Sequence, residues 1–124
     1  MNLEGVRDIL EAEVLYGSEY LGNVVTMVSA SDLLSDVLAF TRPGSLLLTG
    51  LINPQVIRTA EVVELSAICF VRGKRPTEAT IELAKEKEVP LLCTKLPMYE
   101  TSGKLYRCGI AGCSEVDGED ECLL

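Results

Sequence analysis

The chain has 124 residues, 48 % of them hydrophobic and 24 % charged, which is typical of one globular domain and excludes a wholly disordered chain. Its 19 acidic and 11 basic side chains give a formal net charge of −8, which argues against a general nucleic-acid binder, because such proteins need many cations to neutralise phosphates. Histidine is absent, so the usual general base and the commonest metal ligand are missing.

The predicted elements alternate between helices and strands. Apolar residues at helical spacing predict a helix over 3–10, followed by a short strand over 13–16. A β-branched run predicts a strand over 23–29, and Ser31 or Asp32 can cap the helix after it. Three strand–helix units follow, with apolar strands at 45–49, 67–71 and 89–93 and a last helix near 98–106.

Continuous apolar strands that are each followed by a helix predict a mostly parallel sheet covered by helices on both faces. The expected fold class is therefore α/β. The domain is predicted to span residues 1–110, and residues 111–124 are predicted to form an acidic, cysteine-containing C-terminal tail. The second prediction depends on residues 115–121, which hold five acids and no base.

In a parallel sheet the strand-to-helix loops meet at the carboxyl ends of the strands, where ligands of open α/β sheets bind. Each loop also precedes a helix, whose free backbone N–H groups can face an anion. The candidate ligand-binding residues in these loops are Ser31, Thr49, Gly50, Asn53, Arg72, Gly73, Lys74, Thr94 and Lys95.

Positive charge is concentrated in the second of the three loops, where Arg72, Lys74 and Arg75 fall within four residues. A helix that begins just after them adds about half a positive charge. The pattern predicts a ligand that carries phosphate or carboxylate. Two alternatives remain open: a solubilising loop whose cations pair with nearby acids such as Glu78, or a contact with an acidic partner surface.

Catalysis is not expected, and neither a cofactor nor a metal is predicted. The sequence holds no phosphate-binding Gly-x-x-x-x-Gly-Lys-Ser/Thr loop, and without histidine a serine triad cannot form. Cys69 and Cys93 lie in apolar runs and are expected to be core thiols. Cys108, Cys113 and Cys122 lack the paired two-residue spacing of zinc and iron–sulfur sites, although a metal or redox role for them remains an alternative.

Two further expectations concern the surroundings of the protein. The first residues carry acids where a signal peptide needs a basic stretch, and no apolar run approaches the ~18 residues of a membrane span. We therefore expect a cytoplasmic protein with no membrane contact. Tyr99 and Tyr106 are expected to pack in the core, and the alternative for Tyr99 is a place at the lip of the ligand edge.

The sequence resembles the DRTGG domain over about residues 3–110. The segments that carry the resemblance are Thr49-Gly50, Arg58-Thr59-Ala60, Phe70-Val71-Arg72-Gly73-Lys74, Glu82-Leu83-Ala84, Val89-Pro90-Leu91-Leu92 and Thr94 through Met98-Tyr99-Glu100. Three positions depart from the family pattern. Leu51-Ile52-Asn53 stand where many members carry Asp-Arg, Arg72-Gly73-Lys74 replace the usual double glycine, and Met98 replaces a threonine.

The DRTGG domain is similar to the amino-terminal domain of HPr kinase/phosphorylase, and it also occurs beside CBS domains in regulated pyrophosphatases. The resemblance implies a three-layer α/β sandwich with a mostly parallel central sheet, and a regulatory, homodimeric domain rather than an enzyme. With the cationic loop, it implies a small anionic, nucleotide-like ligand. The variant pattern resembles a stand-alone short form encoded near iron-only hydrogenase subunits. A protein partner in a redox complex is thus expected, and a ligand-free structural adaptor is the alternative function.

Overall fold

The computed structural model describes residues 1–114; the predicted acidic run over 115–121 and Cys122 lie outside this part of the chain. The helices within it are α1 (Leu3–Leu10), α2 (Leu34–Phe40), α3 (Gln55–Val63), α4 (Glu78–Lys87) and α5 (Met98–Arg107), with a 3₁₀ turn at Ser18–Tyr20. The strands are β1 (Glu13–Tyr16), β2 (Met27–Ala30), β3 (Ser45–Thr49), β4 (Ala67–Phe70), β5 (Leu91–Cys93) and β6 (Ala111–Gly112).

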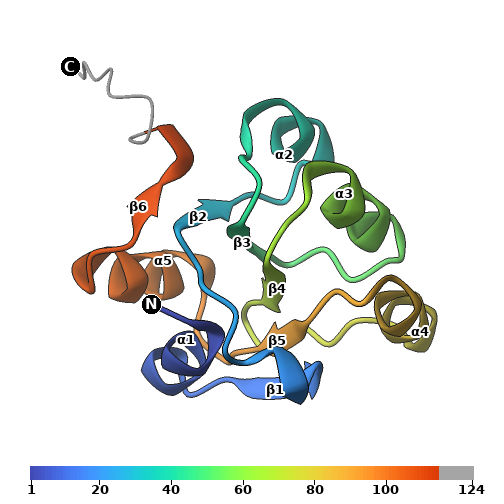
Figure 1. The fold of residues 1–124 in the computed structure, drawn as a ribbon, viewed down its shortest axis with the longest axis horizontal. Helices are drawn as coiled ribbons and strands as arrows, with labels where there is room; N and C mark the ends of the chain where they lie inside the picture. The colour runs from blue at the N-terminus through green and yellow to red at the C-terminus, as the bar shows by residue number, and fades with distance from the viewer. Residues whose placement is uncertain (115–124) are drawn as a thin grey trace.

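The strands form one mostly parallel sheet in the order β1-β5-β4-β3-β2-β6, in which only β1 runs antiparallel to its neighbour. From β2 to β5 the chain crosses the sheet in one direction, so α2, α3 and α4 cover the same face. The connection from β5 to β6 returns across the sheet, so α5 lies on the opposite face beside α1 (Figure 1). The predicted three-layer α/β sandwich is confirmed.

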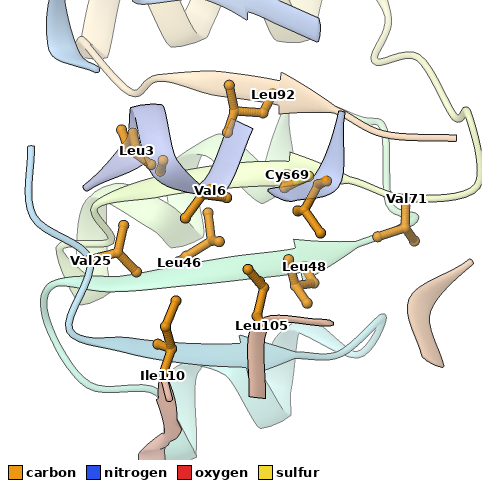
Figure 2. Close-up of a cluster of buried hydrophobic side chains, with 12 residues drawn as sticks. Leu3, Val6, Val25, Leu46, Leu48, Cys69, Val71, Leu92, Leu105 and Ile110 are labelled. Atoms are coloured by element: carbon orange, nitrogen blue, oxygen red, sulfur yellow. The ribbon is translucent and has the colours of Figure 1, made fainter. Parts of the chain in front are cut away.

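Side chains of the central strands alternate between two hydrophobic clusters, one on each face of the sheet. Leu46 and Leu48 of β3 point towards α1 and α5, and Figure 2 shows them in the same cluster as Leu105. Leu47 lies between them in sequence and belongs to the cluster under α2, α3 and α4. Each fully buried leucine contributes roughly 1.5–3 kcal/mol of transfer free energy, so these two clusters hold the sheet edge in place.

The two cysteines predicted for the core are buried free thiols, Cys69 in β4 and Cys93 in β5. Burial raises the pKa of Cys69 from 9.0 to about 12, and it also raises the pKa of Cys93. Among the described residues, no helix is long and apolar enough to cross a membrane.

Three predictions about elements differ from the structure. The strand expected from residue 23 begins only at Met27, because the preceding residues pair with the N-terminus instead: Val25 N–H donates to the Met1 carbonyl at 2.8 Å. Strand β6 was not predicted, since two residues carry no periodic signal. The expected core packing of Tyr99 and Tyr106 is wrong, because these residues are 86 % and 63 % exposed.

Candidate functional site at the carboxyl edge of the sheet

A hollow of about 220 Å³ lies where the carboxyl ends of β2, β3 and β4 meet the start of α5. We call it the cationic hollow. Its lining residues are Asp32, Gly50, Val71, Arg72, Lys74 and Met98. Arg72 and Lys74 are exposed, and within residues 1–114 neither takes part in an ion pair. Two basic side chains and one carboxylate leave the hollow with a net positive charge, which favours an anion.

The carboxylate in this hollow is held by the loop after β3. Asp32 Oδ1 accepts hydrogen bonds from Gly50 N at 2.7 Å and from Thr49 Oγ1 at 3.0 Å. The Thr49 hydroxyl in turn accepts from Leu51 N at 3.1 Å. The Gly50 N–H is thus occupied by an acid of the chain itself, and Leu51 N by the Thr49 hydroxyl. The open oxygen of the carboxylate is Oδ2, for which no hydrogen bond occurs in the described part of the chain.

The loop after β4 presents its cationic side chains, not its backbone donors. Arg72 and Gly73 both adopt the left-handed region, with φ of 59° and 67°. Arg72 N donates to Leu96 O at 2.7 Å, Gly73 N to Thr94 O at 2.8 Å and Lys74 N to Val71 O at 3.0 Å. Because all three N–H groups are used, an anion can be held here only by the guanidinium and the ammonium group.

The same hydrogen bonds close the crevice in which ligands of open α/β sheets usually bind. Helix α4 follows β4 on one face and α5 follows β5 on the other, so the ends of these neighbouring strands form the topological switch point. The loops after the two strands bond to each other across it, and buried Thr94 donates from Oγ1 to Leu10 O at 2.9 Å. The cationic hollow therefore lies beside the switch point, towards β2 and β3.

The third cation of the loop faces away from the hollow. Arg75 makes a two-pronged contact with Glu13 of β1, at 2.9 Å and 3.2 Å. Hydrogen bonding and charge attraction from Arg75 lower the pKa of Glu13 below its ordinary value. Over the described residues, the alternative that the loop cations pair with nearby acids is therefore correct for Arg75 alone among the three. Its partner is Glu13 of the edge strand rather than Glu78.

The remaining candidate residues are dispersed. Ser31 Oγ accepts from Leu33 N at 3.0 Å, and Asn53 Oδ1 accepts from Gln55 N at 3.1 Å, so both oxygens are used in turns before helices. The prediction that Ser31 or Asp32 caps the helix is wrong, because the N-cap of α2 is Leu33 and no side chain of the described residues caps this helix. Thr94 and Lys95 line a smaller hollow of about 140 Å³ that includes Lys104 and lies against α1 and α5. Of the nine predicted residues, the structure brings Gly50, Arg72 and Lys74 together around one hollow.

Helix starts near the sheet edge differ in how their donors are used. Thr77 caps α4 by accepting from Thr80 N, which closes that end to a ligand. Helix α5 has Pro97 as its N-cap and receives no side-chain cap, so its first N–H groups remain open next to Met98. This start adds partial positive charge to the cationic hollow.

A second hollow, of about 350 Å³ and almost wholly apolar, lies between α5 and the β2–β6 edge. We call it the apolar groove. Its lining includes Val28 and Ala30 of β2, Tyr99 and Tyr106 of α5, and Ile110. Sequence reasoning assigned no site residue here apart from the alternative for Tyr99. It also left out Asp32, Val71 and Met98, whose closeness in sequence to the predicted strand ends was the available signal.

No group of three or more potential metal ligands gathers among residues 1–114. Cys108 is exposed and Cys113 lies within 3.3 Å of the Ser45 hydroxyl, while Cys122 falls outside the described residues.

Comparison with known proteins agrees with the geometry of the fold. Among solved structures, the chain resembles the CBS and DRTGG domains of the regulatory region of Clostridium perfringens pyrophosphatase, complexed with the activator diadenosine tetraphosphate. The TM-score is 0.68 at 18 % identity, over 84 % of this chain and 45 % of that chain. This chain thus spans less than half the length of the solved one. No curated protein matches the sequence. The DRTGG domain matches residues 5–108, and the chain therefore belongs to the DRTGG domain family.

Proposed function

We propose that the protein is a non-catalytic regulatory domain that binds a small anionic ligand in the cationic hollow and passes the bound state on to a protein partner. The observation that carries the proposal is the pair Arg72 and Lys74, two exposed cations without an ion-pair partner in residues 1–114 of an acidic chain. Unpaired cations of an acidic protein are free to attract a negatively charged molecule.

Two further features support an anion. The uncapped start of α5 borders the hollow at Met98. The similar solved structure belongs to a regulatory region that was crystallised with a polyanionic activator. These features favour a phosphate compound over a neutral ligand.

We further propose that the domain works as a homodimer and contacts a partner in a redox complex. Exposed apolar side chains on neighbouring helices support a protein contact: Leu33 precedes α2, Leu38 and Phe40 lie on it, and Val62 lies on α3. Their exposed fractions are 56 %, 50 %, 73 % and 69 %. The same surface also suits the second candidate function, a structural adaptor that binds its partner without a ligand.

The test is isothermal titration of the whole chain with inorganic pyrophosphate and with nucleoside phosphates at millimolar concentration. We expect saturable binding that weakens with added salt. Arg72→Ala and Lys74→Ala should each cost about 1.5–3 kcal/mol of binding free energy, the worth of a charge-assisted hydrogen bond. Lys85→Ala removes the same charge from the last turn of α4 and serves as the matched control, which should bind like the unaltered chain.

Absence of binding by every anion would contradict the ligand proposal and favour the adaptor. An adaptor should retain one partner at fixed stoichiometry whether or not an anion is added. A monomer in light scattering at ~100 μM would contradict the homodimer, since the concentration greatly exceeds that at which stable dimers dissociate.

A further inference from the structure

Residues close together in sequence line the cationic hollow and the apolar groove, on two different elements. Ala30 lines the groove and Asp32 the hollow, and their Cα atoms lie at most about 7 Å apart. On the facing element, Tyr99 lines the groove and Met98 the hollow, about 3.8 Å apart at Cα. These short separations along the chain favour one small molecule that reaches both hollows.

The lining residues change from apolar to charged between the apolar groove and the cationic hollow. At one end the groove is apolar and carries the exposed ring of Tyr99. At the other end stand Arg72 and Lys74. The same hollow contains Asp32, which follows the groove residue Ala30 by two positions. Its Oδ1 is fixed by Gly50 N and Thr49 Oγ1, and its Oδ2 is open. A ligand that fits this order carries a flat apolar group, then hydroxyl donors, then an anion.

We propose that this composite site binds a nucleoside 5′-phosphate. The base stacks on Tyr99 in the apolar groove, the ribose hydroxyls donate to Asp32 Oδ2, and the phosphate is held by Arg72 and Lys74. A carboxylate would repel a bare phosphate, so its place in the cationic hollow is explained when it accepts from a sugar hydroxyl. This proposal rests on the proposed function and adds to it the class of ligand and the roles of Asp32 and Tyr99.

The experiment compares ligands that lack one group each, titrated against the whole chain. The probes are AMP, GMP, ribose 5-phosphate and 2′,3′-dideoxy-AMP. Base stacking on an aromatic ring is worth about 5- to 100-fold in affinity, so ribose 5-phosphate should bind at least about fivefold more weakly than AMP or GMP. The dideoxy compound should bind about tenfold more weakly than AMP, since its hydroxyl donors are missing.

Variants assign each group to its residue. Tyr99→Ala should weaken the binding of AMP but leave the affinity for ribose 5-phosphate unchanged. Tyr99→Phe keeps the aromatic ring and should bind AMP like the unaltered chain. Asp32→Asn keeps the oxygen that accepts from Gly50 N and removes the negative charge. Asp32→Asn should weaken the binding of AMP. The dideoxy compound should bind as tightly as before or more tightly, because the repulsion between position 32 and the phosphate falls. Circular dichroism of each variant establishes that it is folded.

Equal affinity for ribose 5-phosphate and AMP overturns this proposal, as does a Tyr99→Ala effect that is the same for both ligands. If ribose 5-phosphate binds as tightly as AMP and the binding of both is lost in Arg72→Ala, the proposed function stands while the nucleotide assignment fails. If none of these anions binds, the proposed function fails and the assignment fails with it.

Discussion

The Asp32 carboxylate accepts a hydrogen bond of 2.7 Å from the backbone N–H of Gly50, and so joins the segment after β2 to the loop after β3. The same oxygen accepts from the buried hydroxyl of Thr49. A Cβ at position 50 would lie 3.6 Å from this oxygen, an ordinary contact. Asp32 therefore has a structural role in shaping the edge as well as a place in the cationic hollow.

Removing this carboxylate should destabilise the loop after β3. We expect Asp32→Ala to lower the free energy of unfolding by about 1–2 kcal/mol, because the Thr49 hydroxyl and Gly50 N–H lose their acceptor. Asp32→Asn retains an acceptor oxygen and should cost less than half as much. Urea unfolding measures both. Equal losses for the two variants would contradict the proposed role of the hydrogen bonds.

The left-handed conformation of Arg72 should be a source of strain. A non-glycine residue in this region costs about 1–2 kcal/mol of conformational free energy, which a glycine would relieve. Part of the relieved strain is offset, because an unfolded glycine has a larger backbone entropy to lose on folding. We expect Arg72→Gly to stabilise the chain by about 0.5–1 kcal/mol in urea unfolding. Lys74→Gly is the control, since φ at Lys74 is not positive, and it should destabilise. A shift of the same sign in both variants would rule out strain as the cause.

The contact between Glu13 and Arg75 should appear in the titration of the acid. Because Arg75 lowers the pKa of Glu13 in the folded chain, the stabilisation from this pair is present above the ordinary pKa of 4.5 and is lost as the pH falls through the lowered value. We expect Arg75→Ala to bring the pKa of Glu13 back towards 4.5, as followed by NMR of its side-chain carboxyl carbon. Lys85→Ala should leave the pKa of Glu13 unchanged. If the pKa of Glu13 is also unchanged in Arg75→Ala, Arg75 is not the cause of the lowered value.

The thiols should differ sharply in reactivity. Cys69 is wholly buried and its pKa is raised to about 12, whereas Cys108 is exposed. Because a raised thiol pKa favours the folded state only below the ordinary value of 9.0, this contribution is lost as the pH rises from there towards 12. At pH 8 we expect iodoacetamide to alkylate Cys108 at least about 100-fold faster than Cys69, as read by mass spectrometry. Comparable rates in the native chain would contradict the burial.

The fold could be predicted where the pattern is continuous. The apolar runs of β3, β4 and β5, with a helix after each, determine parallel strands and a common loop edge. The start of β2 could not be predicted, because Val24 and Val25 carry a strand-like pattern but pair with the N-terminal residues. Strand β6 could not be predicted either, because Ala111 pairs with Met27 only after the chain has crossed back over the sheet through α5.

The sequence predicted where the candidate site lies, but not which contacts its residues make. The charges of Arg72 and Lys74 mark the loop, and the direction of the strands brings Gly50 to the same hollow. Sequence cannot reveal that Lys95 lines a hollow against α1 and α5, because Lys95 lies in the loop after β5, where no strand alternation determines the direction of a side chain. It also cannot reveal which backbone donors the chain already uses, as Arg72 N and Gly73 N do.

An anion held in the cationic hollow should be visible in an NMR titration of the isotope-labelled chain with inorganic pyrophosphate. We predict saturable amide shifts centred on Gly50, Arg72 to Lys74 and Met98, and their loss in the Arg72→Ala, Lys74→Ala double variant. Shifts gathered instead around Lys95 and Lys104, or none at millimolar pyrophosphate, would contradict it.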